Sequence, residues 1–117
     1  MKIFMTYFFY LFLTFFVSET ADANMAYITN EKDNTVSVLD IKKKKVVKTV
    51  EVGQRPRGII MSRDGKLVLI CASDDDRVEV RDAKTMKLKY YLPSGPDPEL
   101  FVLSPDDSVL YIANEDD

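Results

Sequence analysis

A repeat with a constant period of 42 residues constrains the fold of this chain more than any other feature of its sequence. Asp40 and Asp82 are 42 positions apart, and no gap is needed between the two copies. Repeats of about 20 to 50 residues indicate an architecture in which similar units stack on one another. The same offset relates Val36 to Val78, Val38 to Val80, Gly53 to Gly95, Pro56 to Pro98, Ser62 to Ser104, and Asp64 to Asp106.

Each unit carries the signals of four short strands. Ser62 and Gly65 favour a type I turn between the first two strands of the second unit. The apolar run Leu67–Ala72 predicts a strand that is covered on both faces. Polar and apolar residues alternate in Arg77–Arg81, which predicts a strand with one face in solvent. The strands expected in this unit are 57–62, 66–73, 77–81 and 87–92.

Four strands in a unit of about 40 to 45 residues predict the blades of a β-propeller. Each blade stacks between two neighbours, which accounts for strands that are apolar on both faces. A solenoid of stacked sheets is the alternative, but its repeats are usually shorter. We therefore expect an all-β fold with blades of four antiparallel strands, the blade strands lying in 26–52, 57–92 and 99–114. This amounts to two blades and two strands of a third, an incomplete ring whose full-length form we expect to have seven blades.

Residues 1–23 have the form of a secretory signal peptide. A short positive start is followed by the apolar run Ile3–Val17 and then by small and polar residues. We predict cleavage between Ala23 and Asn24, which leaves residues 24–117 as the propeller part of a periplasmic protein. A membrane anchor is the alternative, but the apolar run is shorter than the about 20 residues of a spanning helix. We expect no membrane-spanning segment after cleavage.

Composition argues against several classes of function. The chain has no histidine, the commonest general base and transition-metal ligand, and no nucleophile–base pair stands out. Its net charge of −3 comes without a basic stripe, so we expect no nucleic-acid partner. Asp74–Asp76 lacks the spacing of a calcium loop, and Lys42–Lys45 is interpreted as a solvated turn. The single cysteine, Cys71, lies in an apolar run and is expected in the core.

Candidate binding residues lie in loops that we expect at one end of the propeller, around its channel. Equivalent positions of the repeat carry opposite charges there, with Arg55 against Asp97 and Arg57 against Glu99. We expect the two arginines to bind an anionic group or an acidic patch of a partner. The alternative is that these are solvated charges in ordinary turns. The loops are Gly53–Arg57 and Gly95–Glu99, which lead into inner strands, and Glu31–Asn34, Asp74–Asp76 and Glu115–Asp117, which join second to third strands.

Two strand motifs resemble a known family of propeller repeats. Ala26–Asn30 and Leu110–Asn114 resemble the Tyr-Val-Thr-Asn signature of the YVTN family, and Ser104–Asp106 matches its Ser-Pro-Asp turn. Longer strings look like those of the β-propeller proteins associated with PQQ-dependent catabolism. That resemblance implies a periplasmic Gram-negative propeller linked to pyrroloquinoline-quinone-dependent alcohol oxidation. The longer strings are Asn30–Val38, Gly53–Gly58, Gly95–Phe101 and Asn114–Asp117.

Three functions remain open on the sequence. The first is a non-catalytic binding or scaffold component of that pathway, whose partner is a periplasmic protein or a small molecule. The second is an oxidoreductase subunit that holds a quinone or a haem in its channel, as some propellers do. The third is a cell-surface interaction protein. With no catalytic constellation visible, we expect no enzyme activity, no metal and no resident cofactor.

Overall fold

A computed structural model describes residues 24–115, so the signal peptide expected at 1–23, including Ala23 at its cleavage site, lies outside the described residues. Regular structure in residues 24–115 is β except for a short 3-10 turn, η1 (Ser73–Asp75). None of these residues forms a helix long and apolar enough to cross a membrane. The strands are β1 (Met25–Asn30), β2 (Thr35–Asp40), β3 (Lys45–Glu51), β4 (Pro56–Met61), β5 (Leu67–Ala72), β6 (Arg77–Asp82), β7 (Leu88–Pro93), β8 (Pro98–Leu103) and β9 (Leu110–Asn114).

The strands form three antiparallel sheets, which we call blades 1 to 3. Blade 1 has the order β1-β2-β3, blade 2 the order β4-β5-β6-β7, and blade 3 the order β8-β9. The repeat extends to irregularities in pairing, because the register shifts between Val38 and Leu39 in blade 1 and between Val80 and Arg81 in blade 2. The expected all-β fold of four-stranded antiparallel propeller blades is confirmed.

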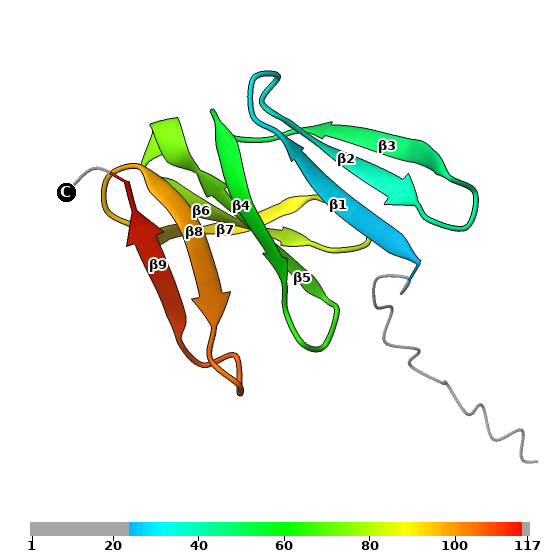
Figure 1. The fold of residues 1–117 in the computed structure, drawn as a ribbon. Helices are drawn as coiled ribbons and strands as arrows, with labels where there is room; N and C mark the ends of the chain where they lie inside the picture. Colours follow the sequence, from blue (N-terminus) through cyan, green and yellow to red (C-terminus); the bar gives the residue numbers. More distant parts are fainter. Residues whose placement is uncertain (1–23, 116–117) are drawn as a thin grey trace, which may run out of the picture.

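Blade 2 lies between the other two blades (Figure 1), and its strand β4 contacts both β1 and β8. Alternate residues of β5 point to opposite neighbours, as the pleat of a strand requires. Ile70 is fully buried against blade 1, and Leu69 is buried against blade 3. The predicted cover on both faces of Leu67–Ala72 is therefore present. Cys71 is a free cysteine in this layer, with none of its surface exposed.

The prediction that one face of strand β6 lies in solvent is wrong. Glu79 and Arg81 are only 2% and 9% exposed. Arg81 Nε donates to Glu79 Oε2 at 2.7 Å, and Arg81 Nη1 donates to the carbonyl of Met86 at 2.9 Å. Because blade 1 covers this face of blade 2, the polar side chains are buried and bind each other instead of water.

Candidate functional site

Loops from all three blades meet at one end of the strands, and we call this end the loop rim. The carbonyl of Arg55 accepts from the amide of Ser73 at 3.2 Å. The carbonyl of Asp97 accepts from the amide of Glu115 at 3.0 Å, which is the same bond one repeat later. The expectation that these loops share one end is met for the part of the chain that the structure describes. The rim consists of residues 31–34, 53–57, 73–76, 95–99 and 115.

A second repeated bond fixes the tips of these loops. Asn34 Oδ1 accepts from the amide of Arg55 at 2.8 Å, and Asp76 Oδ1 accepts from the amide of Asp97 at 2.9 Å. All four residues have positive φ, between 44° and 55°. Asn and Asp adopt this left-handed backbone more readily than most residues, because their short side chains can bond locally. Arg55 has no such advantage, so the loop structure around it holds it there.

Arg55 lies at the centre of the rim. Its Nη1 donates to Asp74 Oδ1 at 3.0 Å, and its Nη2 donates to both oxygens of Asp97 at 3.1 and 3.2 Å. The same nitrogen donates to Glu115 at 3.3 Å, and Nε lies 3.5 Å from a carboxylate oxygen of Glu31. Burial lowers the pKa of this guanidinium, but the charges of Asp97 and Asp74 outweigh burial and raise it. Arg55 is therefore a fixed cation bound by carboxylates from three blades.

Arg57, the second residue of strand β4, makes a parallel set of contacts. Its two terminal nitrogens donate to Glu115 and to Glu99, and its Nε lies 4.0 Å from Glu31. The hydrogen bond to Glu115 is the main reason that its pKa is raised, and Glu99 adds to the effect. Glu115 and Glu31 thus bridge the two arginines. Both glutamates are half exposed, with 50% and 52% of their side-chain surface in solvent.

The structure brings together all four candidate residues, Arg55, Arg57, Asp97 and Glu99, and pairs them across the repeat. Arg55 binds its equivalent Asp97, and Arg57 binds its equivalent Glu99. Opposite charges at equivalent positions of adjacent blades were visible in the sequence, but the pairing was not inferred from them. Sequence reasoning also missed the roles of Glu31, Asp74 and Glu115 as partners of the arginines. Whether the four bind a ligand stays a prediction.

The carboxylates of the acidic run Asp74–Asp76 all bind other groups of the rim. Asp74 binds Arg55, and Asp75 Oδ2 accepts from the amide of Gln54 at 2.8 Å. Among residues 24–115, no group of three or more His, Cys, Asp or Glu side chains has an arrangement that suits a metal ion. The chemistry that the rim offers is therefore charge-assisted hydrogen bonding by two arginines.

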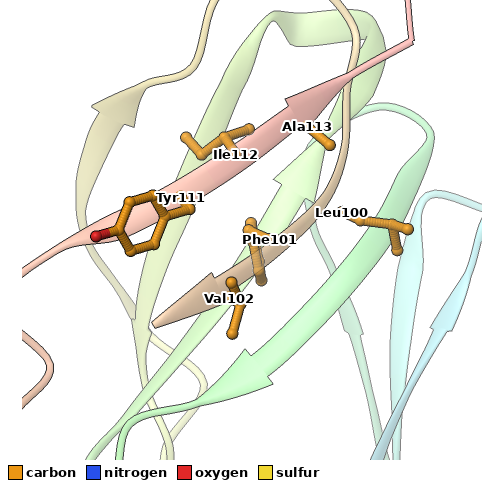
Figure 2. Close-up of a pocket in the computed structure, with 6 residues that line it drawn as sticks. All are labelled: Leu100, Phe101, Val102, Tyr111, Ile112 and Ala113. Atoms are coloured by element: carbon orange, nitrogen blue, oxygen red, sulfur yellow. The ribbon is translucent and has the colours of Figure 1, made fainter. Parts of the chain in front are cut away.

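A separate hollow of about 330 Å³ lies on blade 3, on strands β8 and β9 (Figure 2). Val102 and Tyr111 line it, and both are 60% exposed. Their equivalents in blade 2 are Ile60 and Leu69, which pack against blade 3. The hollow is therefore a sheet face of the kind that a neighbouring blade covers in blade 2, and we do not assign a ligand to it.

Several solved structures are similar to this chain. Hydrazine synthase of Kuenenia stuttgartiensis matches with a TM-score of 0.74 and 25% identity, covering 81% of this chain and 27% of that one. A functionally unknown protein of Desulfotomaculum acetoxidans matches with a TM-score of 0.68 and 19% identity, over 79% of this chain and 32% of that one. The dihydro-heme d1 dehydrogenase NirN, solved in complex with DHE, matches with a TM-score of 0.69 and 21% identity, over 83% and 21%. The chain thus spans less than a third of each structure.

A comparison with curated proteins finds no significant match. A comparison with family models matches residues 15–99 to the cytochrome D1 heme domain. The propeller architecture that the YVTN-like motifs imply agrees with this match and with the similar structures. Because the matched region is well over half of the sequence, the chain belongs to the cytochrome D1 heme domain family.

Proposed function

We propose that this chain is part of a periplasmic β-propeller that holds a haem-type cofactor beside the loop rim. The observation that carries the proposal is the match of residues 15–99 to a family described as a heme domain. Support also comes from NirN, a dihydro-heme d1 dehydrogenase that was solved in complex with DHE. Of the functions left open by the sequence, these likenesses favour the cofactor-holding oxidoreductase subunit.

The residues of the rim fit one part of such a cofactor. Haem-type tetrapyrroles carry ionised carboxylate side groups as well as a central iron. Arg55 and Arg57 are cations with 33% and 23% of their side-chain surface exposed, and they already bind carboxylates. A carboxylate of the cofactor would form the same charge-assisted hydrogen bonds.

A carboxylate of the cofactor could replace a glutamate on each arginine at a small cost in free energy. Glu31 and Glu115 are half exposed, so releasing them into water costs little desolvation. Asp97 is only 14% exposed and binds Arg55 through both oxygens, so it stays in place. Cofactor carboxylates would therefore replace Glu31 and Glu115, while Asp97 and Glu99 keep the arginines oriented.

The described residues do not fit the iron of such a cofactor. The sequence has no histidine. Cys71 is buried between strands, and desolvation raises the pKa of its thiol to about 12, which disfavours the thiolate that binds metals. A ligand of either type would have to come from another part of the protein. We therefore assign this chain a role in binding the cofactor and derive no redox step from it.

The experiment is a haem titration of the protein in its natural full length, followed by visible absorbance. We expect binding to weaken at least about tenfold in the double variant Arg55→Ala/Arg57→Ala, because each charged hydrogen bond contributes about 1.5 to 3 kcal/mol. Arg63→Ala is the matched control, since Arg63 pairs with Asp107 in a turn outside the rim. Equal affinity of the wild type and the double variant would reject the proposal.

A scaffold component of PQQ-dependent alcohol catabolism is the second candidate, favoured by the motifs of Asn30–Val38 and Gly53–Gly58. It predicts no haem absorbance and a partner protein retained by the purified propeller. Both candidates require export, which we propose on the form of residues 1–23. Sequencing the N-terminus of the isolated protein should give Asn24 as the first residue, and a protein that still begins at Met1 would count against export by cleavage.

A further inference from the structure

The turn between β2 and β3 has a composition that the proposed function does not use. Residues 41–49 are all exposed, and they include four consecutive lysines. Apolar side chains flank the lysines: Ile41, Val46 and Val47 are 52%, 53% and 45% exposed. We call residues 41–48 the lysine edge. The lysine edge thus combines clustered cations with exposed branched apolar side chains.

The positive charge of the lysine edge is scarcely neutralised. Among the described residues, the ion pairs within 4.0 Å give its lysines a single carboxylate, Asp40, which lies 3.9 Å from Lys43 Nζ. Asp40 is only 8% exposed. Its Oδ1 accepts a hydrogen bond from the amide of Lys43 at 2.9 Å, which closes the turn. Lys48 Nζ donates to the carbonyl of Thr85 at 2.5 Å. Most of the charge therefore faces solvent.

The fold of the turn does not require these lysines. The equivalent turn of blade 2, between β6 and β7, has the same left-handed position, with φ of 60° at Met86 and 52° at Lys44. There Ala83 and Met86 are buried, with 2% and 1% exposed. The repeat thus makes the same turn with an apolar residue where the lysine edge has Lys44. The lysines are therefore not needed to form the turn.

The lysine edge lies beside the point at which the chain enters blade 1. Asn24 O accepts from the amide of Ile41 at 2.8 Å, and β1 begins at the next residue, so the chain enters blade 1 beside this turn. Figure 1 shows the start of β1 and the β2–β3 turn at the same end of blade 1. With the cleavage that we propose before Asn24, the lysine edge lies beside the N-terminus of the mature chain.

Charge is also separated along the blades. Strand β2 begins at Thr35, next to the rim loop, and ends at Asp40, next to the lysine edge. The rim, at the opposite end of the strands from the lysines, has more acidic than basic groups, since Arg55 and Arg57 face five carboxylates there: Glu31, Asp74, Asp97, Glu99 and Glu115. An anionic surface would attract one end of the molecule and repel the other. The loop rim would then face away from that surface.

We infer that the lysine edge binds a membrane surface of anionic phospholipid. Lysine ammonium groups are point charges on flexible stems, which suits mobile phosphate headgroups. Apolar side chains beside them enter the boundary between headgroups and acyl chains, as in other interfacial anchors. The exposed Ile41, Val46 and Val47 supply the apolar contacts for this boundary.

Sedimentation with vesicles tests this inference on the full chain in its natural form. Vesicles of phosphatidylethanolamine with phosphatidylglycerol are compared with vesicles of phosphatidylcholine. We expect Lys42→Gln/Lys43→Gln/Lys45→Gln to lower the partition coefficient on anionic vesicles about a hundredfold, since each lysine near such a surface contributes about fivefold. Circular dichroism of each variant confirms that the blades remain folded. Val46→Ser/Val47→Ser should lower the partition coefficient about tenfold at a salt concentration that screens the charges.

The matched control removes three charges from the equivalent region of blade 2. Lys84→Gln/Lys87→Gln/Lys89→Gln should change binding less than about threefold. Equal losses in the two triple variants would show unspecific attraction and overturn the inference. Equal binding of all variants would assign membrane contact to residues outside the lysine edge, and would overturn it too. Absence of binding by the wild type, or binding of polyglutamate without binding of vesicles, would have the same consequence.

Discussion

Blade 2 and blade 3 place the same repeat positions in opposite environments. Leu69 of blade 2 is 5% exposed, whereas its equivalent in blade 3, Tyr111, is 60% exposed. Gly58 lies against the backbone of blade 3, whereas its equivalent Leu100 is 61% exposed. The first two strands of the two blades pair in the same way, but blade 2 has two further strands and a neighbour on each face, whereas blade 3 is described only as β8 and β9 beside blade 2. In a repeat fold of this kind, the cost of a substitution depends on which faces of its blade are covered.

The largest expected contrast is in thiol reactivity. Cys71 lies in blade 2, and desolvation raises its pKa from 9.0 to about 12. Its equivalent in blade 3 is Ala113, which is exposed. In a chain of these 117 residues, where no further blade covers β9, Ala113→Cys in a Cys71→Ala background should react with a disulfide reagent about a thousandfold faster than native Cys71, because three pKa units separate their thiolate fractions. Similar labelling rates would show that blade 2 is open to solvent.

The same raised pKa makes stability depend on alkaline pH. The folded state holds the Cys71 proton more tightly than the unfolded chain, so its contribution is complete below about pH 9 and declines towards pH 12. Cys71→Ala should remove this component from a series of denaturant titrations across that range. An unchanged alkaline profile in the variant would contradict the buried thiol.

The second contrast is between the outer turns of blades 2 and 1. Met86 is 1% exposed, so Met86→Ala should lower the free energy of unfolding by about 2 to 5 kcal/mol. Lys44 is exposed at the equivalent place, and Lys44→Ala should change it by no more than about 0.5 kcal/mol. Both positions have positive φ, so any backbone cost to alanine is common to the pair. Equal losses in urea titrations would break the comparison.

The third contrast concerns the contact between blades 2 and 3. A Cβ on Gly58 would lie 2.7 Å from the backbone oxygen of Glu99, which is too close for a backbone that is already packed. We expect Gly58→Ala to cost about 1 to 3 kcal/mol through displacement of β8. Leu100→Ala should cost no more than about 0.5 kcal/mol. A neutral Gly58→Ala in the same denaturant titration would mean that the blades separate readily.

The smallest expected effect is at the turns before β5 and β9. The pKa of Asp106 is lowered to about 2 by hydrogen bonds, first from the hydroxyl of Ser104 and then from the hydroxyl and amide of Ser108. Such a carboxylate contributes stability above its unfolded pKa of about 3.8, and the contribution is lost as the pH falls towards 2. Ser108→Ala removes one donor and should raise the Asp106 pKa in a carbonyl NMR titration. The Asp64 pKa should stay where it is, since its partners Ser62 and Lys66 are unchanged.

The blades and the shared rim could be predicted from the sequence because their signals are local and repeated. Ser62, Asp64 and Gly65 specify a turn, and the constant offset of 42 residues carries that turn to Ser104 and Asp106. Loops at equivalent positions then have to lie at the same end of their blades. The same argument places Arg55 and Asp97 in equivalent loops.

The environments of long polar side chains could not be predicted in this way. The alternation of polar and apolar residues in β6 predicts that Glu79 and Arg81 face solvent, because the sequence does not show that blade 1 covers this face. Both residues are buried. The partners of Arg55 come from loops 19 to 60 residues away in the sequence. Which of several carboxylates a flexible guanidinium contacts depends on how the blades pack, and local sequence does not record that.

The pairing of Arg55 with Asp97, and of Arg57 with Glu99, has a consequence for assembly. Interchangeable units could associate in the wrong sequence, which is a common failure of tandem arrays. The sign reversal between blades 2 and 3 places opposite charges across their junction, whereas two identical units would place like charges against each other. In this way the rim favours the stacking of blade 3 on blade 2 over the stacking of two like-charged units.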